Sequence, residues 1–236
     1  MNITHVDKFL IGRLHDRMLS EKEQIKLIAM ANDETVEELM NLIEEAQSLA
    51  DPIVLFGVCS VTRDAGGTVR VNEVPIESVL VEEKLFDKNL CFPYIASCGT
   101  ALEEWSTKYK TDPLAEYWTD AIKKQYLLRI TARFFSYLKE HYQMAGHLTA
   151  LNPGSLKQWP IAGQRELFSV LGGAAFIEEK IGVSCTECFL ILPTKSISGI
   201  VFESDSFYEN CQYCPQTDCP DRRAVPKTEE GTTCIR

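Results

Sequence analysis

The sequence VSCTECFLILPTKSISGIVF, residues 183–202, contains two stretches of strand-forming residues on either side of a proline. β-Branched, aromatic and other apolar residues dominate both stretches, and residues of this kind are enriched in β-strands. Pro193-Thr194-Lys195 interrupts the pattern, and proline is common in the turns that connect strands. We therefore predict two antiparallel strands, VSCTECFLIL before this turn and SISGIVF after it.

A second strand-rich region lies upstream. IVLFGVCSV, residues 53–61, has the length and composition of a buried strand. Asp64-Ala-Gly-Gly67 is a turn signal, and TVRV at 68–71 predicts the returning strand of a hairpin. Proline cannot donate a backbone hydrogen bond, so Pro75 predicts that the next short segment lies at a sheet edge.

The first 51 residues have the pattern of helices. Ser20 and Glu23 have the spacing of a capping box, in which each side chain bonds the backbone of the other residue. Val36, Leu39 and Ile43 then recur on one face of a second helix. Asp51-Pro52 ends this region, so we predict an N-terminal helical segment at 1–51.

The longest predicted helix begins at Asp112-Pro113, with aspartate as the N-cap and proline in the first turn. Apolar residues recur near a period of 3.6 from there to about Tyr142, which indicates a helix that packs against a core. A short helix is expected at 164–171. Strands and helices do not alternate regularly, so we predict an α+β fold with an antiparallel sheet. The expected organisation is a helical segment at 1–51, a main domain at 52–205 and a cysteine-rich tail at 206–236.

Composition excludes several classes of protein. The 236 residues have a formal net charge of −10, which disfavours binding to nucleic acid or to an anionic membrane through bulk charge. No apolar run is long enough to span a bilayer, and the first residues lack the pattern of a signal peptide. We therefore expect a cytoplasmic protein, in which the nine cysteines are better explained as metal ligands, redox groups or core residues than as disulfides.

The tail contains the clearest cluster of thiols. Cys211, Cys214 and Cys219 lie in the run CQYCPQTDC, and Cys234 nearly closes the chain. Thiolates select zinc or iron–sulfur clusters, and both kinds of site usually take four of them. The sequence favours an iron–sulfur cluster and leaves open a structural zinc site or plain thiols. The fourth ligand would be Cys234 or a residue of the Cys185–Cys188 pair.

Several short motifs between residues 152 and 202 resemble one known family. They are Pro153-Gly154, Ile181-Gly182, Thr186-Glu187, Pro193 and Ser196-Ile-Ser-Gly199. In this order they are similar to the activation, or reactivation, domain of cobalamin-dependent methionine synthase. That resemblance implies a C-shaped α+β fold that binds S-adenosylmethionine, caps a cobalamin domain during reductive methylation, and works with an electron donor such as flavodoxin.

Three positions differ from the family pattern. Ala150 stands where the family has arginine, Ser155 follows Pro-Gly in place of tyrosine, and Val201 replaces a second tyrosine. Arginine is the natural bidentate partner of a carboxylate, and alanine cannot replace it. The sequence therefore argues against retention of the S-adenosylmethionine site.

Together these observations predict an accessory protein of corrinoid-dependent methyl transfer. It would dock on a corrinoid protein or corrinoid methyltransferase and support reductive activation of cobalamin, with electrons supplied by the tail cluster. Two alternatives are an S-adenosylmethionine-binding methyltransferase component, which would make it an enzyme, and a non-catalytic scaffold with a structural zinc tail. The predicted ligand-binding residues are Pro153, Gly154, Glu187, Ser196, Ser198 and Gly199, and the predicted metal ligands are Cys211, Cys214, Cys219 and Cys234. No catalytic residue is predicted.

Overall fold

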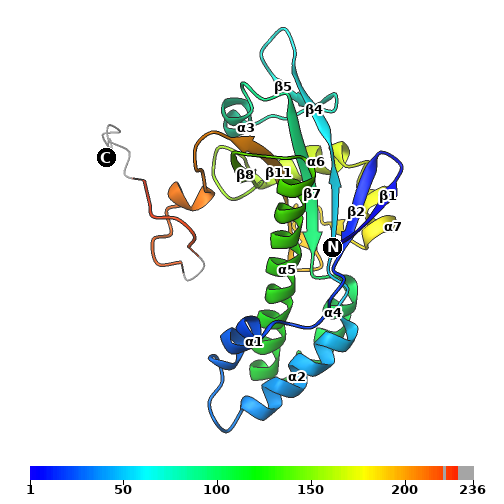
Figure 1. Cartoon of the computed structure of the whole chain (residues 1–236), viewed down its shortest axis with the longest axis vertical. Helices are drawn as coiled ribbons and strands as arrows, with labels where there is room; N and C mark the ends of the chain where they lie inside the picture. Colours follow the sequence, from blue (N-terminus) through cyan, green and yellow to red (C-terminus); the bar gives the residue numbers. More distant parts are fainter. Residues whose placement is uncertain (220–221, 228–236) are drawn as a thin grey trace.

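The structure, a computed structural model, describes residues 1–219 and 222–227 (Figure 1). Within these residues nine strands form one antiparallel sheet, and two short strands form a separate hairpin. The strands of the large sheet are β1 (Asn2–Val6), β2 (Phe9–Arg13), β3 (Ile53–Gly57), β4 (Cys59–Arg63), β5 (Val69–Val71), β6 (Val74–Pro75), β7 (Leu90–Ser97), β8 (His147–Leu151) and β11 (Ser196–Ser204). The hairpin consists of β9 (Ser184–Cys185) and β10 (Ile191–Leu192).

The described residues contain seven α-helices and three short 3-10 turns. They are α1 (Glu21–Ile28), α2 (Val36–Leu49), α3 (Val79–Lys84), α4 (Thr100–Ser106), α5 (Pro113–His141), α6 (Gln164–Val170) and α7 (Ala174–Ile181), with short 3-10 turns η1 (Thr107–Tyr109), η2 (Ile161–Gly163) and η3 (Asn210–Gln212). One half of α5 lies beside the sheet, and α1, α2 and α4 surround its other half (Figure 1). The predicted α+β class with an antiparallel sheet is confirmed.

β7 is the central strand of the sheet. One of its edges pairs with β3 and then β4, and the other pairs with β11, which in turn pairs with β8. Helices cover both faces, so the apolar run of β3 is buried throughout. Phe56 of β3 packs on Phe134 of α5 with ring centroids 4.9 Å apart, whereas Ile53 and Leu55 face the layer formed by α6 and α7.

The predicted helix starts agree with the structure where a local cap determines them. Ser20 accepts a hydrogen bond from the backbone of Glu23, and the Glu23 carboxylate bonds the Ser20 backbone in return. Asp112 caps α5 by accepting from the amides of Leu114 and Ala115. α5 ends at His141, within one residue of the expected end.

The prediction of helices throughout residues 1–51 is wrong for the first part of that segment. Residues 2–13 form the hairpin β1–β2, and β2 adds to the edge of β3. Phe9 and Ile11 pack on one face of the sheet while Leu10 packs on the other, so a strand here completes both layers. The helices of the same segment, α1 and α2, share one hydrophobic cluster with α4 and α5.

The prediction that VSCTECFLIL pairs with SISGIVF is also wrong. Strand β11 contains SISGIVF and lies between β7 and β8 in the large sheet. VSCTECFLIL folds back on itself to form the β9–β10 hairpin. A strand bonded on both edges has more of its backbone hydrogen bonds satisfied than one in an isolated pair, which favours the observed arrangement.

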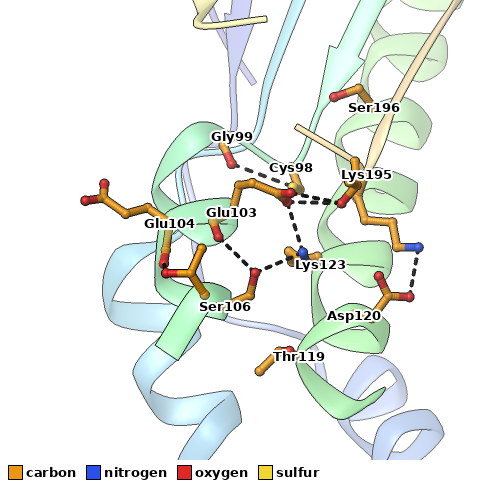
Figure 2. A network of polar contacts seen from close by, with 12 residues as sticks. Cys98, Gly99, Glu103, Glu104, Ser106, Thr119, Asp120, Lys123, Lys195 and Ser196 are labelled. Atoms are coloured by element: carbon orange, nitrogen blue, oxygen red, sulfur yellow. Dashed lines mark hydrogen bonds and ion pairs between the residues drawn. The ribbon is translucent and has the colours of Figure 1, made fainter. Parts of the chain in front are cut away.

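A buried ion pair connects the helical cluster to the segment that precedes β11. Lys123 Nζ of α5 lies 2.9 Å from Glu103 Oε2 of α4 and 3.0 Å from Ser106 Oγ (Figure 2). The same Glu103 carboxylate accepts a hydrogen bond from Thr194 Oγ1 at 3.1 Å. Only 7% of the Lys123 side chain is exposed, so its charge depends on this partner.

None of the helices in the described ranges is both long enough and apolar enough to cross a membrane.

Candidate functional site

A buried amide connects the segments that carry the motif residues. Asn152, which directly precedes Pro153, donates from Nδ2 to the carbonyl oxygen of Ser198 at 2.8 Å and to Tyr94 Oη at 3.2 Å. Its Oδ1 accepts a hydrogen bond from Asn210 Nδ2 of the tail at 3.1 Å. All four residues are at least nine-tenths buried. Asn152 therefore joins the β8 loop, the two central strands and the tail.

Tyr94 remains a neutral phenol in this cluster. Burial raises the pKa of Tyr94 to about 12, although the hydrogen bond from Asn152 acts in the opposite direction. The cluster is therefore a set of neutral hydrogen-bonding groups. It positions backbone segments and offers no acid or base for catalysis near neutral pH.

The predicted ligand-binding serines and glycine of β11 have structural partners. Ser198 donates from Oγ to Gln164 Oε1 at 2.6 Å, and Ser196 donates to Ser97 Oγ at 2.9 Å. Gly199 lies so close to the Leu151 carbonyl and to Asn152 Nδ2 that any Cβ there would collide with them. These residues shape the sheet beside the Pro153-Gly154 loop, and the lack of space explains the glycine.

Two separate cavities adjoin the segments that this cluster connects. The first, which we call the loop–tail cavity, has a volume of about 750 Å³ and is lined by Gly154–Gln158, Pro160, Ile161, Tyr213 and Pro215. The second, the hairpin cavity, has a volume of about 390 Å³ and is lined by Gln164, Arg165, Phe168, Ser169, Ala174, Cys185, Thr186, Glu187 and Phe189. Gly154 and Glu187, which the sequence assigned to one ligand site, therefore line different cavities.

The described part of the tail packs on the main domain. Tyr208 is buried in the same hydrophobic cluster as Leu156, Trp159 and Phe202. Its ring stacks on Tyr213 with centroids 5.6 Å apart, and Tyr213 forms part of the wall of the loop–tail cavity. The tail is thus one side of that cavity and shares its core with the main domain.

The three tail thiols within the described residues do not converge. Cys211, Cys214 and Cys219 are all partly buried, and no group of three or more His, Cys, Asp or Glu side chains in the described ranges is placed to hold a metal ion. The predicted fourth ligand, Cys234, lies outside the described residues. The described residues therefore do not support an iron–sulfur cluster or zinc site in the tail, which stays a prediction from the sequence.

Arg222 organises the loop that carries these thiols. Its guanidinium donates to the carbonyl oxygens of Cys211 and Cys214, the latter at 3.0 Å, and to that of Gln216 at 2.6 Å. A further bond at 3.2 Å reaches the Ala224 carbonyl. Sequence reasoning did not identify Arg222, although an arginine three residues after the last of three clustered cysteines is visible in the run CPDRR.

The positions that differ from the family pattern are filled by apolar packing. Ala150 of β8 and Val201 of β11 are direct cross-strand partners, and both belong to the cluster that packs around α5. Val201 is fully buried. The third, Ser155, is exposed beside Gly154 in the loop–tail cavity. The structure therefore provides no cation at position 150 for a ligand carboxylate.

Cys59, Cys91 and Cys98, which lie outside the tail, are core residues. Burial raises the pKa of Cys59 to about 11 and that of Cys98 to about 12, and it raises the pKa of Cys91 well above its usual range. Because the thiolate is the reactive form, these groups are inert at neutral pH. Cys188, in contrast, is exposed at the tip of the β9–β10 hairpin.

We expect iodoacetamide at pH 8 to label Cys188 rapidly in the folded protein and to leave Cys59, Cys91 and Cys98 unmodified.

The raised pKa values of the buried thiols also predict that the protein is less stable in alkali. The unfolded thiols ionise near pH 9.0, before the folded ones, so the folded state binds more protons and the free energy of unfolding falls as pH rises from about 9 towards 12. Below pH 9 this contribution is fully present. Mass spectrometry of the labelled protein and urea titrations at several pH values test both statements. Equal labelling of Cys98 and Cys188, or an unchanged pH slope in Cys98→Ala, would contradict them.

Comparison with known proteins identifies a solved structure that has the same fold. No family model and no curated protein sequence matches the chain. Among solved structures, the crystal structure of the MetH reactivation domain bound to AdoHcy matches with a TM-score of 0.58 and 12% sequence identity, over 88% of this chain and 82% of that one. At this identity the match shows the same fold, and it includes most of both chains.

Proposed function

We propose that the protein is an accessory factor of corrinoid-dependent methyl transfer, which docks on a corrinoid protein and supports reductive activation of its cobalamin. The observation that carries the proposal is the fold match with the MetH reactivation domain over 88% of this chain. The motifs that resemble the methionine synthase activation family give independent support, because they come from the sequence and not from the shape.

Hydrogen bonds join the segments that carry the motif residues. Pro153-Gly154 and Ser198-Gly199 are more than 40 residues apart in sequence, yet Asn152 bonds the Ser198 carbonyl directly. Gln164 extends the same hydrogen-bonded set to the hairpin cavity, which includes Thr186 and Glu187. Pairing of β8 with β11 brings the Pro153-Gly154 loop and the β11 motif side by side, so both are available to one site.

The surface next to this cluster has the apolar character of a docking site. Ile161 and Tyr213 line the loop–tail cavity, and Phe207 lines an adjoining hollow together with Tyr213. Their exposed fractions are 41%, 38% and 51%, respectively, so all three are accessible to a partner. We propose that this patch, formed by Ile161, Phe207 and Tyr213, is the face that contacts the corrinoid protein.

An adenosyl ligand is the second candidate, and the AdoHcy bound to the neighbouring fold favours it. Ala150 and Val201 argue against the family's mode of binding, because this cross-strand pair packs against α5. Such a ligand would need the loop–tail cavity, in which Lys157 is the one cation among the described lining residues. Calorimetry with AdoHcy and with S-adenosylmethionine distinguishes this enzyme component from the accessory protein.

Docking is tested with a purified cobalamin-loaded corrinoid protein. We expect the full chain to bind it, and to increase the rate at which its inactive cobalt(II) form is methylated when titanium(III) citrate and S-adenosylmethionine are supplied, as followed by cobalamin absorbance. Ile161→Asp should weaken binding at least tenfold, because it introduces a charge into the apolar patch. Leu128→Asp is the matched control, since Leu128 is a similarly exposed apolar residue, 47%, on α5 beside α1. Absence of binding, or an equal effect of both variants, would contradict the proposal.

A further inference from the structure

The hairpin cavity has the features of a small-molecule site, and none of its lining residues belongs to the patch proposed to contact the corrinoid protein. Its volume of about 390 Å³ falls in the range of cavities that hold small ligands. It lies between α6, the start of α7 and the loop of the β9–β10 hairpin. The loop–tail cavity and the apolar patch are formed by other residues, so this site can be judged independently.

The floor of the cavity is apolar except for one fixed amide. Phe168 is 4% exposed and Gln164 is 5% exposed, and both line the cavity. Gln164 Oε1 is already engaged by the Ser198 hydroxyl at 2.6 Å. The remaining Nε2 group has two donor hydrogens, for which the described part of the chain supplies no acceptor. Nε2 is not among the buried atoms that lack a partner, so it is open to the cavity, where a ligand oxygen can accept from it.

Two opposite charges line the same cavity. Arg165 is on the first turn of α6, and Glu187 is on the hairpin loop. Neither of them forms an ion pair within the described residues. The Arg165 guanidinium lies 5.3 Å above the Phe189 ring, a stacking geometry that leaves its N–H donors free for a carboxylate.

The hairpin loop holds its side chains in an unusual backbone conformation. Phe189 has φ +63°, which is rare for a bulky residue and costs backbone strain. The loop is fixed by Thr186, which bonds the backbones of Phe189 and Leu190 at 2.9 and 2.8 Å and accepts a further bond at Oγ1. Strain of this kind is retained where the surrounding structure requires it, and here it places the Phe189 ring beneath Arg165.

We propose that the hairpin cavity binds a free α-amino acid with an apolar side chain. The ligand carboxylate would bond Arg165 and Gln164 Nε2, the ammonium group would bond Glu187, and the side chain would lie on Phe168. This ligand class satisfies both charges, the fixed amide and the apolar floor together. A simple carboxylic acid leaves Glu187 without a partner, and a simple amine leaves Arg165 without one.

The test is calorimetry of the full chain with L-methionine, L-leucine and L-phenylalanine. Methionine amide and N-acetylmethionine are the matched probes, because one lacks the carboxylate and the other lacks the ammonium group. We expect at least one amino acid to bind, and each modified methionine to bind at least tenfold more weakly than L-methionine. Arg165→Gln and Glu187→Gln should each reduce amino-acid affinity at least tenfold, whereas Lys157→Gln in the loop–tail cavity should change it less than twofold.

A second variant keeps the proposal testable if the charge changes disturb the fold. Ala174→Phe leaves both charges in place and fills the cavity from the start of α7. It should abolish binding while circular dichroism and the unfolding midpoint stay near the values of the unmodified protein. The proposal is overturned if none of the three amino acids binds at millimolar concentration, if N-acetylmethionine binds as well as methionine, or if binding survives Ala174→Phe. None of these results depends on whether a corrinoid protein docks.

Discussion

Glu103→Gln is expected to lower the free energy of unfolding by about 3 kcal/mol, because it leaves the ammonium group of Lys123 buried without a counter-charge. Lys123 Nζ lies 2.9 Å from Glu103 Oε2, and only 7% of the lysine side chain is exposed (Figure 2). The substitution is isosteric, so the loss reports the missing charge and not a cavity. Urea unfolding followed by circular dichroism measures it.

The double variant Glu103→Gln with Lys123→Met should regain most of this loss, since an apolar side chain of similar length removes the unpaired charge. Asp120→Asn is the matched control in the same region. Asp120 pairs with Lys195 at 2.8 Å, but the two side chains are 50% and 26% exposed, so the loss should be below about 0.5 kcal/mol. A loss for Glu103→Gln no larger than that for Asp120→Asn would show that the Lys123 pair does not stabilise the fold.

Asn152→Ala should have an effect of similar size and a second effect on the tail. It removes partners from the Ser198 carbonyl, from Tyr94 and from Asn210, all of which are buried. A buried polar group left without a partner costs about 1–3 kcal/mol, and backbone adjustment reduces the sum, so we expect a total loss of about 3 kcal/mol. Hydrogen exchange should also accelerate at residues 208–213, where the tail packs on the main domain.

Asn210→Ala separates these two effects. It removes only the bond from the tail, so it should cost about 1 kcal/mol and accelerate exchange in the tail without changing β7 or β11. If Asn152→Ala were no more destabilising than Asn210→Ala, the bonds to Ser198 and Tyr94 would contribute nothing. Thermal unfolding of the two single variants and of the double variant measures the difference.

The parts of the fold that were predicted from the sequence are those determined locally. The start of α5 depends on Asp112 and Pro113, and the capping box of α1 depends on Ser20 and Glu23, so a short window of sequence contains the whole signal. The turn before Val69 was also local, because Asp64 and the following glycines determine it. These predictions are confirmed.

The central strand β7 was missed because Pro93 lies in its middle. Proline is normally restricted to sheet edges or bulges, and here Pro93 is opposite Ile200 within a central strand. The true partner of β11 was missed for a related reason. Pairing between β7 and β11 joins residues about 100 positions apart, and no local pattern specifies which distant strands meet.

The candidate site was predicted in part. The motifs identified the Pro153-Gly154 loop and the β11 serines, which do lie close together through Asn152. They did not reveal that Glu187 faces a different cavity, nor that Asn210 of the tail completes the cluster. Both facts depend on side-chain contacts between distant segments, and these are specified by packing and not by spacing in the sequence.

The Arg222 side chain and the Tyr208 ring hold the described tail in place from two sides. The Arg222 guanidinium donates hydrogen bonds to the carbonyl oxygens of Cys211, Cys214 and Gln216. Tyr208 anchors the same segment in the core of the main domain. The shape of the described tail is therefore determined by contacts within the chain itself, through the Tyr208 ring and the Arg222 guanidinium.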